Sequence, residues 1–141
     1  MADLSIGRTA AKTGVKVPTI RYYEEVGLMP PAPRNQGNQR VYDEQAIKRL
    51  RFIAHARQLG FSLEQIGQLL HLSDDPGQSC VQANQIAQQH LREIESRMKR
   101  LRSLKKELLN MVDVCQSNGT IADCRVIETL ADHGKCLSRE H

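Results

Sequence analysis

The chain has 141 residues, four cysteines and a net charge of +4. The positive excess lies in residues 1–60, which hold ten Lys or Arg and five Asp or Glu, whereas residues 61–141 hold ten Lys or Arg and eleven Asp or Glu. This length accommodates one compact domain with an appended helix, which argues against a large enzyme core, and no apolar run has the form of a signal peptide or reaches the roughly 18 residues of a membrane span. We therefore expect a cytoplasmic protein without membrane contact, whose cysteines act as metal ligands, redox thiols or buried small residues rather than as disulfides.

The N-terminal part predicts two short helices joined by a tight turn. Residues 5–13 form the first helix, which stops at Gly14, and the second helix has Pro18 in its first turn and ends at Val26, before Gly27. This is the helix-turn-helix arrangement, in which the second helix enters the major groove of DNA. A basic half with this motif, joined to a neutral helical half, is typical of a nucleic-acid module on a partner or sensor module.

The second helix has one apolar face and one face suited to DNA. Ile20, Tyr23 and Val26 can face the core, whereas hydroxyl and guanidinium groups on the other face suit phosphate oxygens and base edges. The DNA-binding candidates on this helix are Thr19, Arg21, Tyr22 and Tyr23. The alternative is a plain surface helix.

A short hairpin, or wing, is predicted in residues 34–42, after a proline-rich segment. Gly37 and Asn38 can adopt the positive φ that its tight turn needs. Contacts from a wing to backbone phosphates position a protein on DNA without reading sequence. The DNA-binding candidates of the wing are Arg34, Asn38, Arg40 and Tyr42.

Two further helices complete the DNA-binding module. Asp43 caps a helix over residues 44–59 that ends before Gly60, and Ser62 with Gln65 has the capping-box pattern for a helix that ends near residue 71. Arg57, on the first of these helices, is a candidate for a phosphate contact, with a solvated surface position as the alternative. The expected core residues in this part are Leu50, Ile53, Ala54, Leu59, Phe61, Ile66, Leu69 and Leu70.

A long helix is predicted over residues 79–116, where Ser79 is a candidate cap and Cys80 falls in the first turn, at which the helix dipole favours a thiolate. Steps of four and three residues from Cys80 to Cys115 trace a stripe in which seven of the nine intervening positions are apolar, and the flanking positions are charged. Such a stripe indicates a packing seam. It comprises Cys80, Asn84, Ala87, Leu91, Ile94, Met98, Leu101, Lys105, Leu108, Val112 and Cys115.

The cysteines of this helix lie too far apart to share a metal within one chain. Five heptads separate Cys80 from Cys115, which is roughly 50 Å at 1.5 Å per residue. In an antiparallel homodimer the start of each helix meets the end of its partner, so two equivalent sites result. Because Cys124 follows on a loop short enough to fold back, the predicted metal ligands are Cys80 of the partner subunit, Cys115 and Cys124.

The segment after Cys124 is expected to close the loop. Its apolar residues Val126, Ile127 and Leu130 predict one or two helical turns that pack the loop against the dimer. Further on, His133, Cys136 and His141 could form a secondary metal site, but we favour a disordered tail.

In this order, the pieces resemble the MerR family of transcriptional regulators over nearly the whole chain. The resemblance implies a mainly α fold, with a winged helix-turn-helix DNA-binding domain in residues 1–73, an antiparallel coiled-coil dimerisation helix in residues 79–116, and a metal-binding loop, short helix and tail in residues 117–141. One departure is Gln39, which stands in the wing where the family often has an aromatic or apolar residue. The segments that carry the resemblance are Ile6-Gly-Arg, Gly14-Val, Thr19-Ile-Arg-Tyr-Tyr-Glu, Val26-Gly-Leu, Arg34 through Arg40-Val-Tyr42, Leu50-Arg-Phe-Ile, Gly60-Phe-Ser-Leu and Ile66 to Leu70.

The three cysteines Cys80, Cys115 and Cys124 match the pattern of the branch of that family that senses mercury, lead, cadmium or zinc. A third thiolate favours a divalent soft or borderline ion over copper(I). Three sulfurs suit mercury or lead, whereas zinc or cadmium usually takes a fourth ligand, and Val114 and Gly119 stand where the zinc pattern has further ligands. We therefore rank cadmium, lead and mercury above zinc.

The resemblance also implies a mechanism. A homodimer on double-stranded promoter DNA would bend and untwist an overlong promoter spacer when metal binds, so that RNA polymerase engages both promoter elements and heavy-metal resistance or efflux genes are activated. One alternative is a thiol-redox regulator that switches through a disulfide, and a less favoured one is a metal-buffering protein. Because no nucleophile and base set, phosphate-cradling loop or paired acids are present, the sequence does not indicate an enzyme.

Overall fold

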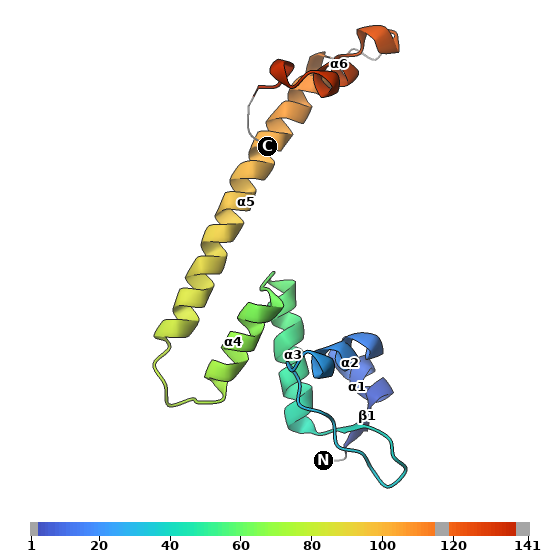
Figure 1. Cartoon of the computed structure of the whole chain (residues 1–141), viewed down its shortest axis with the longest axis vertical. Helices are drawn as coiled ribbons and strands as arrows, with labels where there is room; N and C mark the ends of the chain where they lie inside the picture. The colour runs from blue at the N-terminus through green and yellow to red at the C-terminus, as the bar shows by residue number, and fades with distance from the viewer. Residues whose placement is uncertain (1–2, 115–118, 138–141) are drawn as a thin grey trace. The chain divides into compact units, whose positions relative to one another are not determined.

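The computed structural model of the chain describes residues 3–114 and 119–137. Two compact units are formed, Met1–Ile86 and Ala87–His141, and helices dominate both (Figure 1). The elements in chain order are β1 (Leu4–Ser5), α1 (Ile6–Thr13), α2 (Val17–Glu25), β2 (Val41–Tyr42), α3 (Glu44–Gln58), α4 (Leu63–Ser73), α5 (Val81–Val114), η1 (Ile121–Asp123), α6 (Arg125–Ala131) and η2 (His133–Lys135), where η marks a 3-10 helix.

The helix-turn-helix of the first unit is set by local signals at the helix ends. Ser5 Oγ accepts a hydrogen bond from the Arg8 N–H (3.3 Å), and Gly14, with a φ of 76°, ends α1. Pro18 lies in the first turn of α2, and a second left-handed glycine, Gly27 with a φ of 84°, follows that helix. The predicted bounds of both helices are confirmed to within one residue.

The wing is closed by a turn with a single β-bridge between Arg34 and Arg40. Asn38 takes a φ of 62° in this turn, whereas Gly37, also predicted to supply a positive φ, does not. At the end of the wing, β2 pairs with β1 in antiparallel register (Leu4 opposite Tyr42). This pairing was not predicted, because two-residue strands have no recognisable alternation of apolar and polar residues.

Both α3 and α4 begin at predicted signals, and α3 also ends at one. Asp43 Oδ1 accepts a backbone N–H (2.8 Å) at the start of α3, and Gly60, with a φ of 88°, follows its end. Ser62 and Gln65 form a complete capping box, in which each side chain accepts the backbone N–H of the other at 3.1 Å and 2.9 Å. The α4 helix then continues to Ser73, two residues beyond the predicted end.

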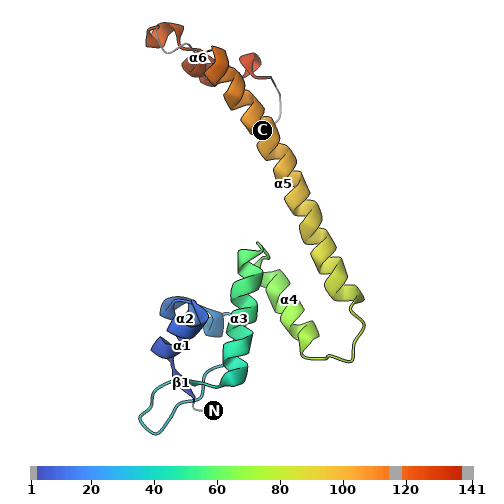
Figure 2. The ribbon, with the colours of Figure 1, turned by 180° about the vertical axis from the view of Figure 1, so that it is seen from behind.

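The helices α1, α2, α3 and α4 of the first unit share one apolar core. Figure 2 shows these helices from behind. The predictions of Leu59 and Val26 as core residues are wrong, because these side chains are 55% and 46% exposed at the C-caps of α3 and α2, where the helices stop. Ala54, Phe61 and Leu69 are half-buried. The predicted core residues that are buried are Ile20, Tyr23, Leu50, Ile53, Ile66 and Leu70, and those the sequence patterns missed are Val15, Leu28, Met29, Tyr42, Ile47 and Ala56.

The α5 helix is continuous over 34 residues, which corresponds to about 51 Å. After residues 115–118, α6 confirms the predicted helical turns at Val126, Ile127 and Leu130, and the two 3-10 turns η1 and η2 lie on either side of it in the chain. No helix within residues 3–114 and 119–137 combines the length and apolar character that crossing a membrane requires.

Candidate DNA interface and thiol site

Three arginines from two elements line one hollow of the first unit. Arg21 comes from α2, and Arg34 and Arg40 come from the wing. This arginine hollow has a volume of about 570 Å³ and is also lined by Ser5, Ile6 and Gln39. Three guanidinium groups around one open hollow suit phosphate oxygens, which arginine binds through several N–H donors.

Contacts within the first unit position the two wing arginines. Arg34 donates from Nη1 to the Asn38 carbonyl (2.9 Å), so its side chain lies across the wing turn. Arg40 Nη1 lies 3.2 Å from Glu24 Oε2, and the Glu24 side chain is only 9% exposed. Glu24 Oε1 also accepts a hydrogen bond from the Tyr42 hydroxyl (2.5 Å). Burial of the ring, followed by this hydrogen bond, raises the pKa of Tyr42 to about 12.

The surface of α2 presents part of the predicted DNA-binding set. Arg21 and Tyr22 are exposed and Thr19 is half-buried. Tyr23, predicted both to face the core and to contact DNA, is 7% exposed within the core. Its assignment to the DNA contacts is therefore corrected, because neighbouring apolar side chains cover its ring.

Of the DNA contacts predicted in the wing and α3, that of Tyr42 is corrected. Tyr42 is 2% exposed and donates to Glu24, so it anchors the base of the wing instead of clamping phosphate. Asn38 is exposed, as a DNA contact requires. Arg57 is also exposed, but it donates to the Phe61 carbonyl (2.9 Å) and does not line the arginine hollow.

Glu24 is the functional candidate that the sequence analysis missed. It follows Ile20 by four residues, so it lies on the same face of α2 as that buried residue. A carboxylate on a buried helix face needs a partner, and this pattern was the available signal.

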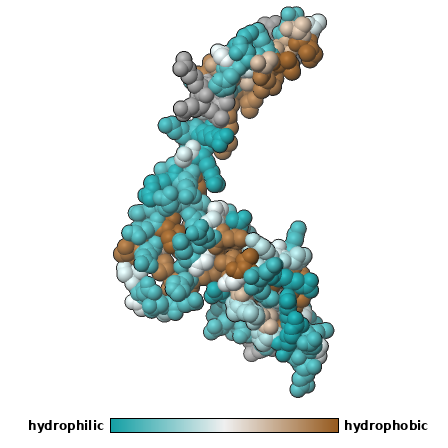
Figure 3. Space-filling model, viewed as in Figure 1, coloured by the Kyte–Doolittle hydropathy of each residue, from teal (hydrophilic) through white to brown (hydrophobic). Residues whose placement is uncertain are grey.

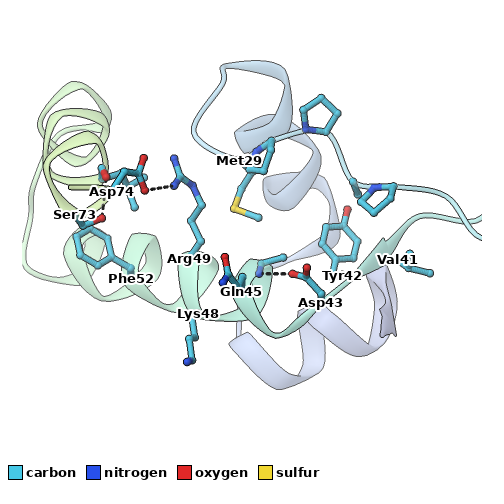
Figure 4. A pocket seen from close by; sticks show the side chains of 16 residues that line it. Met29, Val41, Tyr42, Asp43, Gln45, Lys48, Arg49, Phe52, Ser73 and Asp74 are labelled. Carbon is cyan, nitrogen blue, oxygen red and sulfur yellow. Dashed lines mark hydrogen bonds and ion pairs between the residues drawn. The ribbon is translucent and has the colours of Figure 1, made fainter. Parts of the chain in front are cut away.

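A second hollow, of about 560 Å³, lies between the proline-rich segment, α3 and the end of α4 (Figure 4). Arg49 Nε donates to the Leu28 carbonyl (2.7 Å), and Arg49 Nη1 lies 3.6 Å from Asp74 Oδ1. Arg49 thus ties α3 to the turn after α2 and to the end of α4. This hollow therefore lies where Arg49 connects three segments of the first unit.

Cys80 lies directly before α5, where its thiol is free and exposed. Its carbonyl accepts the Asn84 N–H (2.9 Å), so Cys80 is the N-cap residue rather than a first-turn residue, and the predicted position is corrected by one residue. Ser79, predicted as the cap, lies one residue before Cys80, and its Oγ accepts the Val81 N–H (3.3 Å). This position leaves the Cys80 thiol accessible to a metal ion.

Cys124 is half-buried at the junction of η1 and α6. Its N–H donates to the Ile121 carbonyl (3.1 Å), and its carbonyl accepts the Glu128 N–H (3.0 Å), so the backbone here is fixed by both turns. Cys115 lies outside the described residues. Within the described part of one chain, no three His, Cys, Asp or Glu side chains are grouped closely enough to hold a metal ion. The thiols of Cys80 and Cys124 still have the donor chemistry that soft and borderline metals prefer.

The segment after α6 is folded as far as the structure describes it. Around η2, the Cys136 N–H donates to the His133 carbonyl (3.0 Å), and Lys135 forms an ion pair with Glu128 of α6. The hydrogen bond from Lys135 is the main cause that holds the pKa of the Glu128 carboxyl below its usual value. The favoured prediction of a disordered tail is therefore wrong for η2, and His141 lies outside the described residues.

The apolar stripe of α5 is exposed in the single chain, and hydrophobic side chains gather on the C-terminal half of this helix (Figure 3). Leu101, Leu108 and Val112 are 59 to 64% exposed. A contiguous run of exposed apolar side chains marks an interaction surface. A hollow of about 440 Å³ on this face is lined by Leu101, Leu104, Lys105, Leu108, Leu109 and Val112.

Known proteins resemble this chain along most of its length. Residues 4–72 match the family model described as MerR HTH family regulatory protein, and residues 47–111 match the model described as MerR, DNA binding. The HTH-type transcriptional regulator ZntR of Escherichia coli (strain K12) is 39% identical over 127 residues, which cover 89% of this chain and 90% of the relative.

Two solved structures are similar in fold and sequence. The transcription regulator PbrR691 from Ralstonia metallidurans CH34, in complex with lead(II), is 35% identical with a TM-score of 0.79, over 90% of this chain and 98% of that one. The regulator MerR from Bacillus megaterium MB1, in complex with mercury(II), is 30% identical with a TM-score of 0.69, over 91% and 99% of the two chains. The similarity therefore extends over nearly the full length of both solved chains.

Proposed function

The chain belongs to the MerR family of helix-turn-helix regulatory proteins, and from this membership we propose that it activates heavy-metal resistance or efflux genes when a divalent metal ion binds its cysteine thiolates. The family resemblance and the mainly helical fold with a long helix are confirmed. Because proteins of this family are transcription regulators, the prediction that the chain is not an enzyme is also confirmed.

Binding to promoter DNA is supported by the arginine hollow. It combines Arg21 of the helix expected to enter the major groove with two arginines of the wing. Tyr22 and Thr19 flank Arg21 on the same helix and offer hydroxyl groups to the backbone or to base edges. In this proposal the wing arginines fix the protein on the phosphates, and α2 reads the sequence.

The metal-dependent part of the proposed function rests on the continuity of α5. Cys80 directly precedes this helix of about 51 Å and Cys115 directly follows it, so one chain cannot bring both thiols to one ion. An antiparallel homodimer would bury the exposed stripe and place Cys80 of each chain beside the opposite end of its partner. The ligand set is then Cys80 of the partner subunit, Cys115 and Cys124.

Sulfur chemistry supports a divalent soft ion as the effector. Three thiolates suit lead or mercury, whereas zinc and cadmium usually take a fourth ligand. The two related structures hold lead(II) and mercury(II), which supports a heavy-metal ion as the effector.

The proposed response acts through the shape of the dimer. Thiolates from both chains that share one ion favour one dimer geometry over others, because an effector shifts only states for which its affinity differs. The two DNA-binding units would then bend and untwist the promoter so that RNA polymerase engages both promoter elements.

Metal titration of the purified protein, followed by thiolate-to-metal charge-transfer absorption, tests the site. Cys80→Ser, Cys115→Ser and Cys124→Ser are each expected to lose the absorption band at stoichiometric metal and to lose metal-induced transcription. All three should keep DNA binding, because no cysteine lines the arginine hollow.

Cys136→Ser is the matched control, since it removes a free thiol outside the proposed ligand set. It should keep both the band and the transcriptional response. Unchanged bands in the three other Ser variants would overturn the thiolate site. Activation by an oxidant without added metal would instead favour a thiol-redox regulator, and wild-type protein without salt-sensitive duplex binding would favour metal buffering.

A further inference from the structure

Glu24 of α2 is a carboxylate that neither the predicted DNA contacts nor the thiol site includes. Its side chain is 9% exposed, and its two oxygens have different partners. Oε1 accepts the hydrogen bond from the Tyr42 hydroxyl at 2.5 Å, and Oε2 lies 3.2 Å from Arg40 Nη1. Because the Tyr42 ring is buried in the core, Glu24 connects a fixed core residue to an arginine of the wing.

This connection determines where one side of the arginine hollow lies. Arg21 lies three residues before Glu24 on α2, whereas Arg40 comes from the wing, and both line the hollow. The Arg40 side chain is 32% exposed, so only part of its guanidinium is taken up by Glu24. Because Arg40 also lines the hollow, an anion there can meet the exposed part of this side chain.

We propose that Glu24 is a positioning residue for DNA binding, which holds Arg40 beside Arg21 so that one stretch of phosphate backbone meets both guanidinium groups. This inference rests on the proposed DNA-binding function. A carboxylate near phosphates would by itself weaken binding through repulsion, whereas a positioning carboxylate strengthens it. The sign of the effect on removing its charge therefore tests the role.

The probe is a short fluorescent duplex of random sequence, and its binding to the full-length protein is followed by anisotropy between about 50 and 200 mM salt. Phosphate contacts do not depend on sequence, so no operator is required. Glu24→Gln keeps an acceptor for the Tyr42 hydroxyl but removes the charge that holds Arg40. We expect the affinity to fall by about tenfold. The plot of log affinity against log salt should become less steep, with the magnitude of its negative slope smaller by about one per protomer.

Glu25→Gln is the matched control, because Glu25 is the next residue on α2, is exposed, and loses the same charge. Its removal should leave affinity unchanged or slightly increased, since only repulsion is lost. If Glu24→Gln binds the duplex as tightly as Glu25→Gln, the positioning role is overturned.

A double-mutant cycle with Arg40→Met separates positioning from a general effect on the fold. If Glu24 acts through Arg40, Glu24→Gln causes no further loss in the Arg40→Met protein, and a full additional loss there overturns the proposal. Circular dichroism checks folding. If Glu24→Gln is unfolded, Glu24→Asp replaces it in the cycle, because it keeps the charge but is one methylene shorter. No further loss of affinity in the Arg40→Met protein then supports the proposal, and a full additional loss overturns it. If the affinity of the wild-type protein for the duplex does not depend on salt concentration, the DNA-binding function itself is overturned.

Discussion

The Tyr42 hydroxyl, at the base of the wing, keeps its proton to a pH at which a solvated tyrosine has lost it. Burial of the ring and the hydrogen bond to Glu24 raise its pKa from 10.0 to about 12. A pKa raised on folding contributes stability that is fully present below the unfolded pKa and is lost as the pH rises through the folded pKa. The Tyr42 contribution should therefore disappear between pH 10 and about pH 12.

Urea unfolding followed by circular dichroism measures this effect. Below pH 10 we expect wild-type protein to exceed Tyr42→Phe in unfolding free energy by about 1.5 to 3 kcal/mol, the net value of a hydrogen bond to a charged acceptor. The difference should shrink as the pH approaches 12. A difference that stays constant over this range would contradict the role of the hydroxyl.

For single residues, sequence patterns indicated burial better than function. Ile20 and Leu50 were predicted in the core from apolar spacing alone, and both are fully buried. Tyr23 and Tyr42 were assigned to DNA because hydroxyl groups suit phosphate oxygens, but burial of their apolar rings determines their positions. The role of Glu24 could not be predicted, because its partners come from the wing, 16 and 18 residues further along the chain.

For whole elements, helix ends were predictable because their signals are local. The capping box of Ser62 and Gln65 begins α4, and the left-handed Gly14 and Gly60 follow the ends of α1 and α3. Each of these signals lies within one or two turns of the helix end that it marks. The pairing of β1 with β2 joins residues 4 and 42, so it depends on the packed fold rather than on either short segment. The α5 stripe was predictable because its spacing repeats over the whole helix.

The same stripe predicts how the dimer can be broken. Leu101→Glu places a charge in the proposed seam, at a side chain that is 63% exposed in the single chain. Because two-fold symmetry repeats the change, the dimer should lose about 3 to 6 kcal/mol of apolar burial, which raises its dissociation constant by at least about a hundredfold.

Light scattering after size exclusion gives the direct readout. Leu101→Glu should elute with the single-chain mass of 15.9 kDa at concentrations where wild-type protein has twice that mass. Arg102→Glu, one position off the stripe on the same helix, is the control and should remain dimeric. An unchanged mass for Leu101→Glu would show that this stripe is not the seam.

For the whole molecule, the sequence indicated the members of the candidate thiol site and predicted their assembly in an antiparallel homodimer, which stays a prediction. Cys80 and Cys124 were identified from sequence spacing, and the structure adds their surroundings: one exposed at the N-cap of α5, the other half-buried between η1 and α6. The proposed site also needs Cys115 and a second chain. No local pattern specifies how two copies pair, because pairing depends on the full length of α5 in both.

The central claim, that each metal site is shared between two chains, is tested most directly with mixed dimers. Cys80→Ser and Cys115→Ser chains carrying different affinity tags are co-expressed, the heterodimer is purified, and metal is titrated against charge-transfer absorption. In the heterodimer, Cys80 of the second variant can meet Cys115 and Cys124 of the first. With a shared site we expect one bound ion per heterodimer, none for either variant homodimer and two for the wild-type dimer. A heterodimer without the band, or a variant homodimer that keeps it, would contradict the shared site.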